Sequence, residues 1–258
     1  MRKRLLVLIS VAVFLLTFFT INTLSGPTTR VSATSLQIKT PTEVKRDLTP
    51  GIRVMTIGSS VAAGWGDPNG GGYLAIAFHD LSERTGKHYQ IVSWAIPGIT
   101  TVQVAPHYQH WLTFVHPQIV VISWGGLDDA ANHTPLTVFA NNVHTEIALA
   151  LAAGAQVDIV TPPVTEQVYL DGPKGLPYQY FQAEIREAQS FQSPDVHIYN
   201  VYNQMLDYIQ AHHQTLKPYI DNSWHPNLRG HELGGALLFA DISAQMPQHI
   251  ITQSPEHK

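Results

Sequence analysis

The chain has 258 residues with a formal net charge of −4, 14 histidines and no cysteine. The absence of cysteine excludes thiol catalysis, cysteine zinc sites and disulfides together, and the slightly acidic balance provides no basic field to hold nucleic acid. Charged residues make up 13% of the chain, about half the usual share. With many histidines, this composition suggests a surface suited to an acidic exterior.

The N-terminus begins with a basic segment, Met1–Arg4, and continues with an uncharged stretch at 5–29, in which LLVLISVAVFLLTFF is strongly apolar. This stretch is longer than the core of a cleaved signal and close to the length that crosses a bilayer. We therefore expect 1–30 to be a signal peptide or a membrane anchor, slightly favouring a retained anchor. The rest would then be exported, extracellular or at the cell surface. Residues 31–50, rich in Thr, Ser and Pro, are expected to be a spacer.

From Gly51 onward, short β-rich runs alternate with segments of helical character. The strands are expected at 52–58, 90–94, 118–124, 156–161 and 196–201. The helices are expected at 73–85, 101–115, 135–153, 178–192, 203–213 and 229–245. Apolar strands separated by helices indicate a parallel sheet covered on both faces. We predict one α/β domain at 51–249, a doubly wound three-layer sandwich around a central, mainly parallel five-stranded sheet of flavodoxin-like type, with a tail at 250–258.

The first predicted strand ends abruptly in Gly58-Ser59-Ser60, within VMTIGSSVAAGWG at 54–66. In such a fold, ligands bind outside the carboxyl ends of the strands. Ser60 would begin a helical turn there, where free N–H groups favour negative charge. Two interpretations stay open at this point: a serine that caps a helix, or a nucleophile.

Three further blocks follow the ends of predicted strands or precede the last helix: SWAIPGITT at 93–101, SWGGLDD at 123–129 and DNSWHPNLRGH at 221–231. Taken in order with the first block, they resemble the blocks of the SGNH, or GDSL-type, hydrolases, a family of esterases and lipases. Gly58-Ser59-Ser60 matches its Gly-Asp-Ser block with Ser59 in the Asp place. Gly98 matches its oxyanion glycine, and His225 its catalytic histidine.

The resemblance implies that Ser60 is the nucleophile and His225 its general base, with the backbone N–H groups of Ser60 and Gly98 forming the oxyanion hole. The chemistry agrees, because a serine hydroxyl needs a base to take its proton and return it to the leaving group. Histidine does both near neutrality. His231 is expected at the surface of the following helix.

The third block departs from the family pattern. Leu127 stands where the family has an asparagine that donates to the oxyanion, and Asp128 and Asp129, when ionised, only accept. Loss of one such donor costs about 2.7–4 kcal/mol, or 10²–10³ in rate, in a protease. Asn132 is a candidate substitute.

The residue that orients His225 is open to two interpretations. Family spacing points to Asn222, three residues before the histidine, and charge points to Asp221. A carboxylate stabilises the imidazolium, and an Asp-to-Asn change costs about 10⁴ in trypsin turnover. We predict Asp221, with a bulge at Asn222 absorbing the extra residue.

Four tryptophans lie within the blocks. Trp65 and Trp224 are predicted to line the substrate site, and Trp94 and Trp124 are either core or cleft residues. We expect no cofactor and no metal, since the neighbouring His212 and His213 lack the spacing of a metal motif.

The sequence therefore predicts an exported serine esterase that cleaves a carboxylic ester of a lipid or an O-acetylated saccharide through a Ser-His-Asp acyl-enzyme mechanism. Its expected partners are that ester and, if the N-terminal segment is uncleaved, a membrane, but not nucleic acid. The alternative is a catalytically weak hydrolase-like domain that binds a cell-surface glycan, which the missing donor at Leu127 keeps open.

Overall fold

The computed structural model describes residues 51–246. The predicted anchor and spacer at 1–50 and the predicted tail at 250–258 lie outside the described residues, so the domain boundaries stay predictions. Between residues 51 and 246, no helix is both long and apolar enough to cross a membrane.

A parallel five-stranded sheet forms the centre of the described region, with the strand order β2-β1-β3-β4-β5. Its strands are β1 (Ile52–Gly58), β2 (Tyr89–Ser93), β3 (Ile119–Ser123), β4 (Gln156–Val160) and β5 (Val196–Tyr199). This is the flavodoxin-like order, so the predicted fold class is confirmed. In the register of β1 with β3, Gly58 lies opposite Ser123. The segments that follow these two strands therefore leave the sheet side by side.

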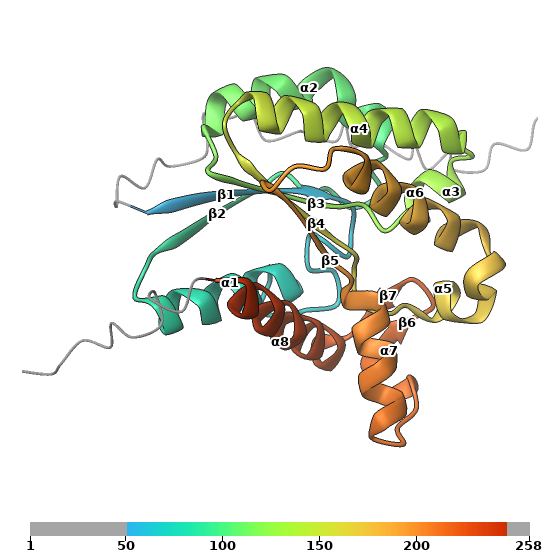
Figure 1. Ribbon diagram of the computed structural model, residues 1–258. Coiled ribbons are helices and arrows are strands. Elements are labelled where there is room, and N and C mark those ends of the chain that lie inside the picture. Colours follow the sequence, from blue (N-terminus) through green and yellow to red (C-terminus); the bar gives the residue numbers. More distant parts are fainter. Residues whose placement is uncertain (1–50, 247–258) are drawn as a thin grey trace, which may run out of the picture. The chain divides into compact units, whose positions relative to one another are not determined.

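Helices cover both faces of the sheet (Figure 1), as the alternating pattern predicts. On one face lie α2 (Thr101–Val115), α4 (Leu136–Ala152) and α6 (Leu176–Ser190), and on the other α1 (Gly72–Thr85) and α8 (Leu228–Gln245). With α7 (Val201–Ala211), these six helices agree with the predicted ranges to within two residues at each end.

Several short elements at the carboxyl end of the sheet are additional to the prediction. They are the helices α3 (Leu127–Ala131) and α5 (Glu166–Asp171), the 3₁₀ turns η2 (Gly172–Lys174) and η3 (Lys217–Tyr219), and a hairpin of β6 (Ile220–Asn222) and β7 (His225–Pro226). The hairpin carries the predicted catalytic histidine.

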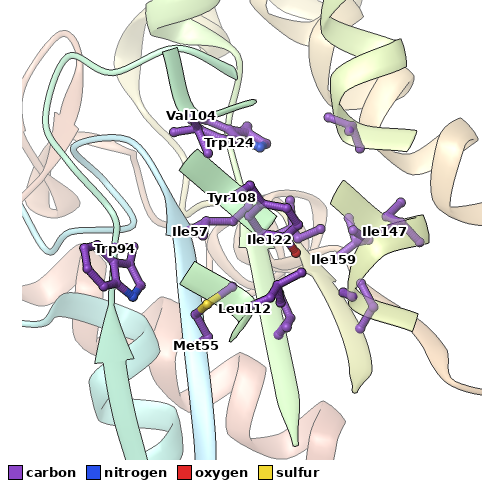
Figure 2. Packing of buried hydrophobic residues seen from close by; sticks show 14 of the residues in the cluster. Met55, Ile57, Trp94, Val104, Tyr108, Leu112, Ile122, Trp124, Ile147 and Ile159 are labelled. Atoms are coloured by element: carbon purple, nitrogen blue, oxygen red, sulfur yellow. The ribbon is translucent and has the colours of Figure 1, made fainter. Parts of the chain in front are cut away.

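Large apolar side chains fill the space between the sheet and each helical layer. Figure 2 shows the cluster under α2 and α4, where Met55, Ile57 and Ile122 from the strands meet Tyr108 and Leu112. Burying each such side chain contributes about 1.5–3 kcal/mol. Trp94 and Trp124 belong to this core, 6% and 4% exposed.

Candidate active site

Ser60 lies where β1 ends. The carbonyl oxygen of Ser59 accepts the N–H of Ala63 at 2.9 Å, which closes one helical turn directly after the strand. Gly58 allows this turn, because its φ is +150° and a Cβ there would lie 2.1 Å from the carbonyl oxygen of Ser123. The side chain of Ser60 is half-buried at the edge of the sheet.

Ser60 and His225 meet although 165 residues separate them. The Oγ of Ser60 lies 3.0 Å from the Nε2 of His225. Asn227 anchors the hairpin that carries His225: its Oδ1 accepts the N–H of Gly230 at 3.1 Å and caps α8, and its Nδ2 donates to the carbonyl of Pro218 at 3.0 Å. The predicted serine and histidine therefore lie in hydrogen-bonding contact.

The pKa of His225 is lowered from its ordinary value, mainly because burial disfavours the imidazolium. The carboxylates of Asp128 and Asp221 act in the opposite direction and raise it, and nearby His231 lowers it further. A neutral imidazole accepts a proton, so this environment keeps His225 ready to act as a base.

The residue bonded to His225 is Asn222 and not Asp221. The Nδ1–H of His225 donates to the Oδ1 of Asn222 at 2.9 Å. The predicted direct contact from Asp221 is therefore wrong. In the hairpin, Asn222 pairs with His225 and the register shifts between Ile220 and Asn222, so the bulged residue is Asp221. The carboxylate of Asp221 instead accepts from the Nδ2 of Asn222 at 2.9 Å.

Gly98, the predicted oxyanion glycine, lies in the loop between β2 and α2 with a φ of +79°. Among residues 51–246 its N–H has no acceptor, and a Cβ there would meet nothing within 4 Å. The N–H of Ser60 donates to the Oγ of Ser59 at 2.5 Å. Asp129 fixes the end of the Gly98 loop, because its carboxylate accepts both the N–H (3.2 Å) and the hydroxyl (2.9 Å) of Thr101.

The third block supplies no side-chain amide to this site. Leu127 packs into a separate apolar cluster with Val164 and Phe181. Asn132, the candidate substitute, donates its amide to the carbonyl of Asp128 at 2.8 Å. The carboxylate of Asp128 accepts the hydroxyl of Ser59. The family has an Asp at the position of Ser59 in the first block. In this chain, Ser59 stands there and is hydrogen-bonded to the carboxylate of Asp128, which follows β3.

Two exposed tryptophans flank His225. The ring of Trp65 stacks on the imidazole with centroids 5.3 Å apart and an interplanar angle of 28°. Trp65 is 51% exposed and Trp224 is 38% exposed. Trp65 therefore lies against the base itself, a stacking that was not predicted, and Trp224 directly precedes His225 in the hairpin; their role in binding substrate stays a prediction.

His231 is fully buried, so the prediction of a surface position is wrong. Its Nε2–H donates to the carbonyl of Trp65 at 2.8 Å, and its Nδ1 accepts the N–H of Tyr73 at 3.1 Å. A neutral imidazole satisfies both bonds, and burial lowers its pKa. His231 thereby joins α8 to the loop that carries Trp65.

As for metal ligands, the described part of the chain contains no group of three or more His, Asp or Glu side chains that could hold an ion.

The model of the GDSL-like Lipase/Acylhydrolase family matches residues 56–233, more than half of the chain. The chain belongs to this family. It is therefore a GDSL-type hydrolase, and the match spans both the serine turn and the histidine hairpin. No curated protein matches this GDSL-type hydrolase by sequence.

Solved structures of a hydrolase and of two esterases share the fold of this GDSL-type hydrolase. LAE5, an alpha/beta hydrolase enzyme from the metagenome of Lake Arreo, Spain, is 18% identical, with a TM-score of 0.63 over 76% of this chain and 97% of its own. EstA, a psychrotrophic esterase from Pseudoalteromonas sp. inhibited by monoethylphosphonate, is 18% identical, with a TM-score of 0.57 over 74% and 97%. A catalytic mutant of Axe2, an acetylxylan esterase from Geobacillus stearothermophilus, is 14% identical, with a TM-score of 0.61 over 75% and 95%.

Proposed function

We propose that this protein hydrolyses carboxylic esters through an acyl-enzyme on Ser60. The observation that carries the proposal is the 3.0 Å contact between the Oγ of Ser60 and the Nε2 of His225. Because the Nδ1–H of His225 is held by Asn222, its Nε2 is the free acceptor that a general base needs.

In the first half of the reaction, the Oγ of Ser60 attacks the ester carbonyl and its proton passes to the Nε2 of His225. The N–H groups of Gly98 and Ser60 then bind the oxyanion. His225 returns the proton to the leaving alcohol, and the acyl group stays on Ser60. Water, deprotonated by His225, attacks the acyl-enzyme in the second half and releases the acid.

For the substrate, we propose a lipid ester or an O-acetylated saccharide. The exposed ring of Trp65 beside His225 and the exposed side chain of Trp224, the residue before it in the chain, provide aromatic surface on which an apolar chain or a sugar ring packs. The likeness in fold to an acetylxylan esterase supports the second class.

A second candidate, a weakly active domain that binds a cell-surface glycan, rests on Leu127. Its side chain is turned into the core, so the oxyanion receives donors from backbone groups alone. Losing one donor lowers the rate by about 10²–10³ but leaves catalysis measurable, and this favours the esterase.

The test is hydrolysis of p-nitrophenyl acetate by the purified native protein and the Ser60→Ala and His225→Gln variants, with Ser193→Ala as a remote serine control. We expect turnover in the native protein and the control, and a loss of at least about 10³-fold in the other two variants. Equal rates in all four proteins would reject the proposal, and binding of an acetylated glycan without turnover would favour the second candidate.

We also propose that the protein is exported, on the basis of the basic start and the uncharged stretch at 5–29 with its apolar segment LLVLISVAVFLLTFF. Cell fractionation of the full chain tests this. We expect to recover the protein in the extracellular medium or at the external surface of the cell. Recovery in the soluble cytoplasmic fraction would contradict the proposal.

A further inference from the structure

Behind His225 lies a short hydrogen-bonded chain that ends in a carboxylate. Asn222 bonds the imidazole at 2.9 Å, and Asp221 bonds Asn222 at 2.9 Å. We propose that Asp221 is a positioning residue that acts through Asn222: it fixes which end of the amide faces His225 and supplies the negative charge that the amide lacks. This proposal rests on the proposed roles of Ser60 and His225.

The two ends of the Asn222 amide have opposite consequences for catalysis. With Oδ1 toward His225, the proton sits on Nδ1 and Nε2 is free to accept from Ser60. With the NH₂ group toward His225, Nδ1 would have to accept, the proton would move to Nε2, and the base would be blocked.

The surroundings of the amide select the productive orientation. A carboxylate accepts hydrogen bonds and does not donate them, so the Oδ2 of Asp221 requires the NH₂ end of Asn222. At the other end, the N–H of Trp224 donates to Oδ1 at 2.9 Å. A flipped amide would place its oxygen against the carboxylate and its NH₂ against the Trp224 donor.

The charge of Asp221 also reaches His225. A neutral amide leaves the imidazolium that forms during the reaction largely uncompensated, whereas a carboxylate stabilises it. Around His225, the carboxylates of Asp221 and Asp128 favour the imidazolium, whereas burial and His231 oppose it. Of the two carboxylates, Asp221 is the one linked to the ring through a hydrogen-bonded path.

The hairpin offers a matched control in Ser223, which lies in the same turn but outside this chain of bonds. Its hydroxyl donates to Glu166 at 2.9 Å, and its carbonyl accepts the N–H of Gln167 at 2.8 Å. Ser223→Ala removes a side-chain bond that tethers the turn and leaves Asp221, Asn222 and His225 unchanged.

The experiment measures the tautomer and pKa of His225 by ¹⁵N NMR, assigned with His225→Gln, together with ester turnover. It compares the native protein with Asp221→Ala, Asp221→Asn, Ser223→Ala and the double variant Asp221→Asn with Asn222→Asp, each checked for folding by circular dichroism. In the native protein we expect the Nδ1–H tautomer. Both single Asp221 variants should shift toward Nε2–H, lower the pKa of His225 and reduce kcat about 10–100-fold, the usual effect of losing an outer hydrogen-bond partner.

The double variant moves the carboxylate one position nearer the ring, so it should recover the Nδ1–H tautomer and most of kcat, and Ser223→Ala should keep the native tautomer and pKa. The proposal is overturned if the single Asp221 variants keep the native tautomer and pKa of His225, whatever their kcat. It is also overturned if the double variant recovers neither the Nδ1–H tautomer nor kcat. The NMR readout needs no substrate. A native protein without turnover whose tautomer still depends on Asp221 would reject the proposed function and retain this inference.

Discussion

His225 is covered on one ring face by Trp65 and bonded at both ring nitrogens. This enclosure explains why burial is the main influence on its pKa. It also places an aromatic face against the imidazolium that forms when Ser60 gives up its proton, an arrangement that attracts cations. At the scale of single residues, therefore, burial favours the neutral imidazole of His225, and the ring of Trp65 partly compensates the imidazolium when it forms.

The lowered pKa of His225 has a consequence for the pH profile. Because the neutral form is the active base, a lowered pKa extends activity to lower pH. The acidic limb of kcat/KM should lie below 6.5, the ordinary value for histidine. Steady-state rates from pH 4 to 9 measure it, and a limb at or above 6.5 in a protein still folded at that pH would contradict the expected effect of burial.

At the scale of elements, the site exists because three segments approach closely at the carboxyl end of the sheet: the turn after β1, the hairpin of β6 and β7, and the start of α8. Gly66 marks the contact between the first two. Its φ is +94°, and a Cβ there would lie 2.1 Å from the carbonyl oxygen of Pro226. Gly66 therefore lets this turn pack directly on the backbone next to His225.

Gly66→Ala should separate Ser60 from His225. We expect kcat to fall at least about 10-fold, since small misplacements of reacting groups have large effects, and the free energy of unfolding to fall by about 1–3 kcal/mol. Gly70→Ala is the matched control, because Gly70 has a φ of +81° but a Cβ there meets nothing within 4 Å. Kinetics and urea denaturation measure both effects, and equal losses of kcat in the two variants would show that the close approach is not what matters.

The long helices and buried strands could be predicted because their apolar patterns extend over many residues. The end of the first strand drew attention to Ser60, but only the resemblance to the GDSL-type family indicated Ser60 as the nucleophile and Gly98 as the oxyanion glycine. The hairpin is too short to have such a pattern. Its register decides between Asn222 and Asp221, and charge alone favoured the wrong residue for the contact. His231 was placed at the surface because sequence does not reveal that the backbone atoms of Trp65 and Tyr73 satisfy both of its nitrogens.

At the scale of the whole molecule, the carboxyl groups of two glutamates, Glu146 and Glu184, are buried between the sheet and its helical layer. The indole N–H of Trp124 donates to Glu146 at 2.8 Å, and the backbone N–H of Trp124 donates to Glu184 at 3.2 Å. Burial raises the pKa of Glu184 to about 8 and that of Glu146 well above its ordinary value. Both groups are therefore neutral in the folded protein at mildly acidic pH.

These groups link stability to pH. The folded-state pKa of Glu184 is above the unfolded value of 4.5, so its favourable contribution is complete below pH 4.5 and is lost as pH rises toward 8. The pKa of His197 is raised mainly by its hydrogen bond to Asp158, so its contribution to stability is also lost as pH rises above the ordinary pKa of histidine. Burial lowers the pKa of His231, so the contribution of His231 to stability is lost as pH falls.

Glu184→Gln should therefore flatten the dependence of Tm on pH. Relative to the native protein, the variant should gain Tm as pH rises from 5 to 8, because glutamine has no proton to lose and keeps the acceptor for Trp124. Differential scanning calorimetry in matched buffers measures the difference. A constant difference in Tm across this range would mean that the carboxyl group of Glu184 has the same pKa in the folded and unfolded states, and would contradict the prediction.

The central claim is that Ser60, activated by His225, is the nucleophile of this GDSL-type hydrolase. Incubation with a fluorophosphonate, followed by peptide mass spectrometry, tests it most directly, because the reagent traps an activated serine without requiring the natural substrate. We predict one covalent adduct, on Ser60, in the native protein and none in Ser60→Ala. An adduct on the neighbouring Ser59, or no adduct on a folded protein, would contradict the account.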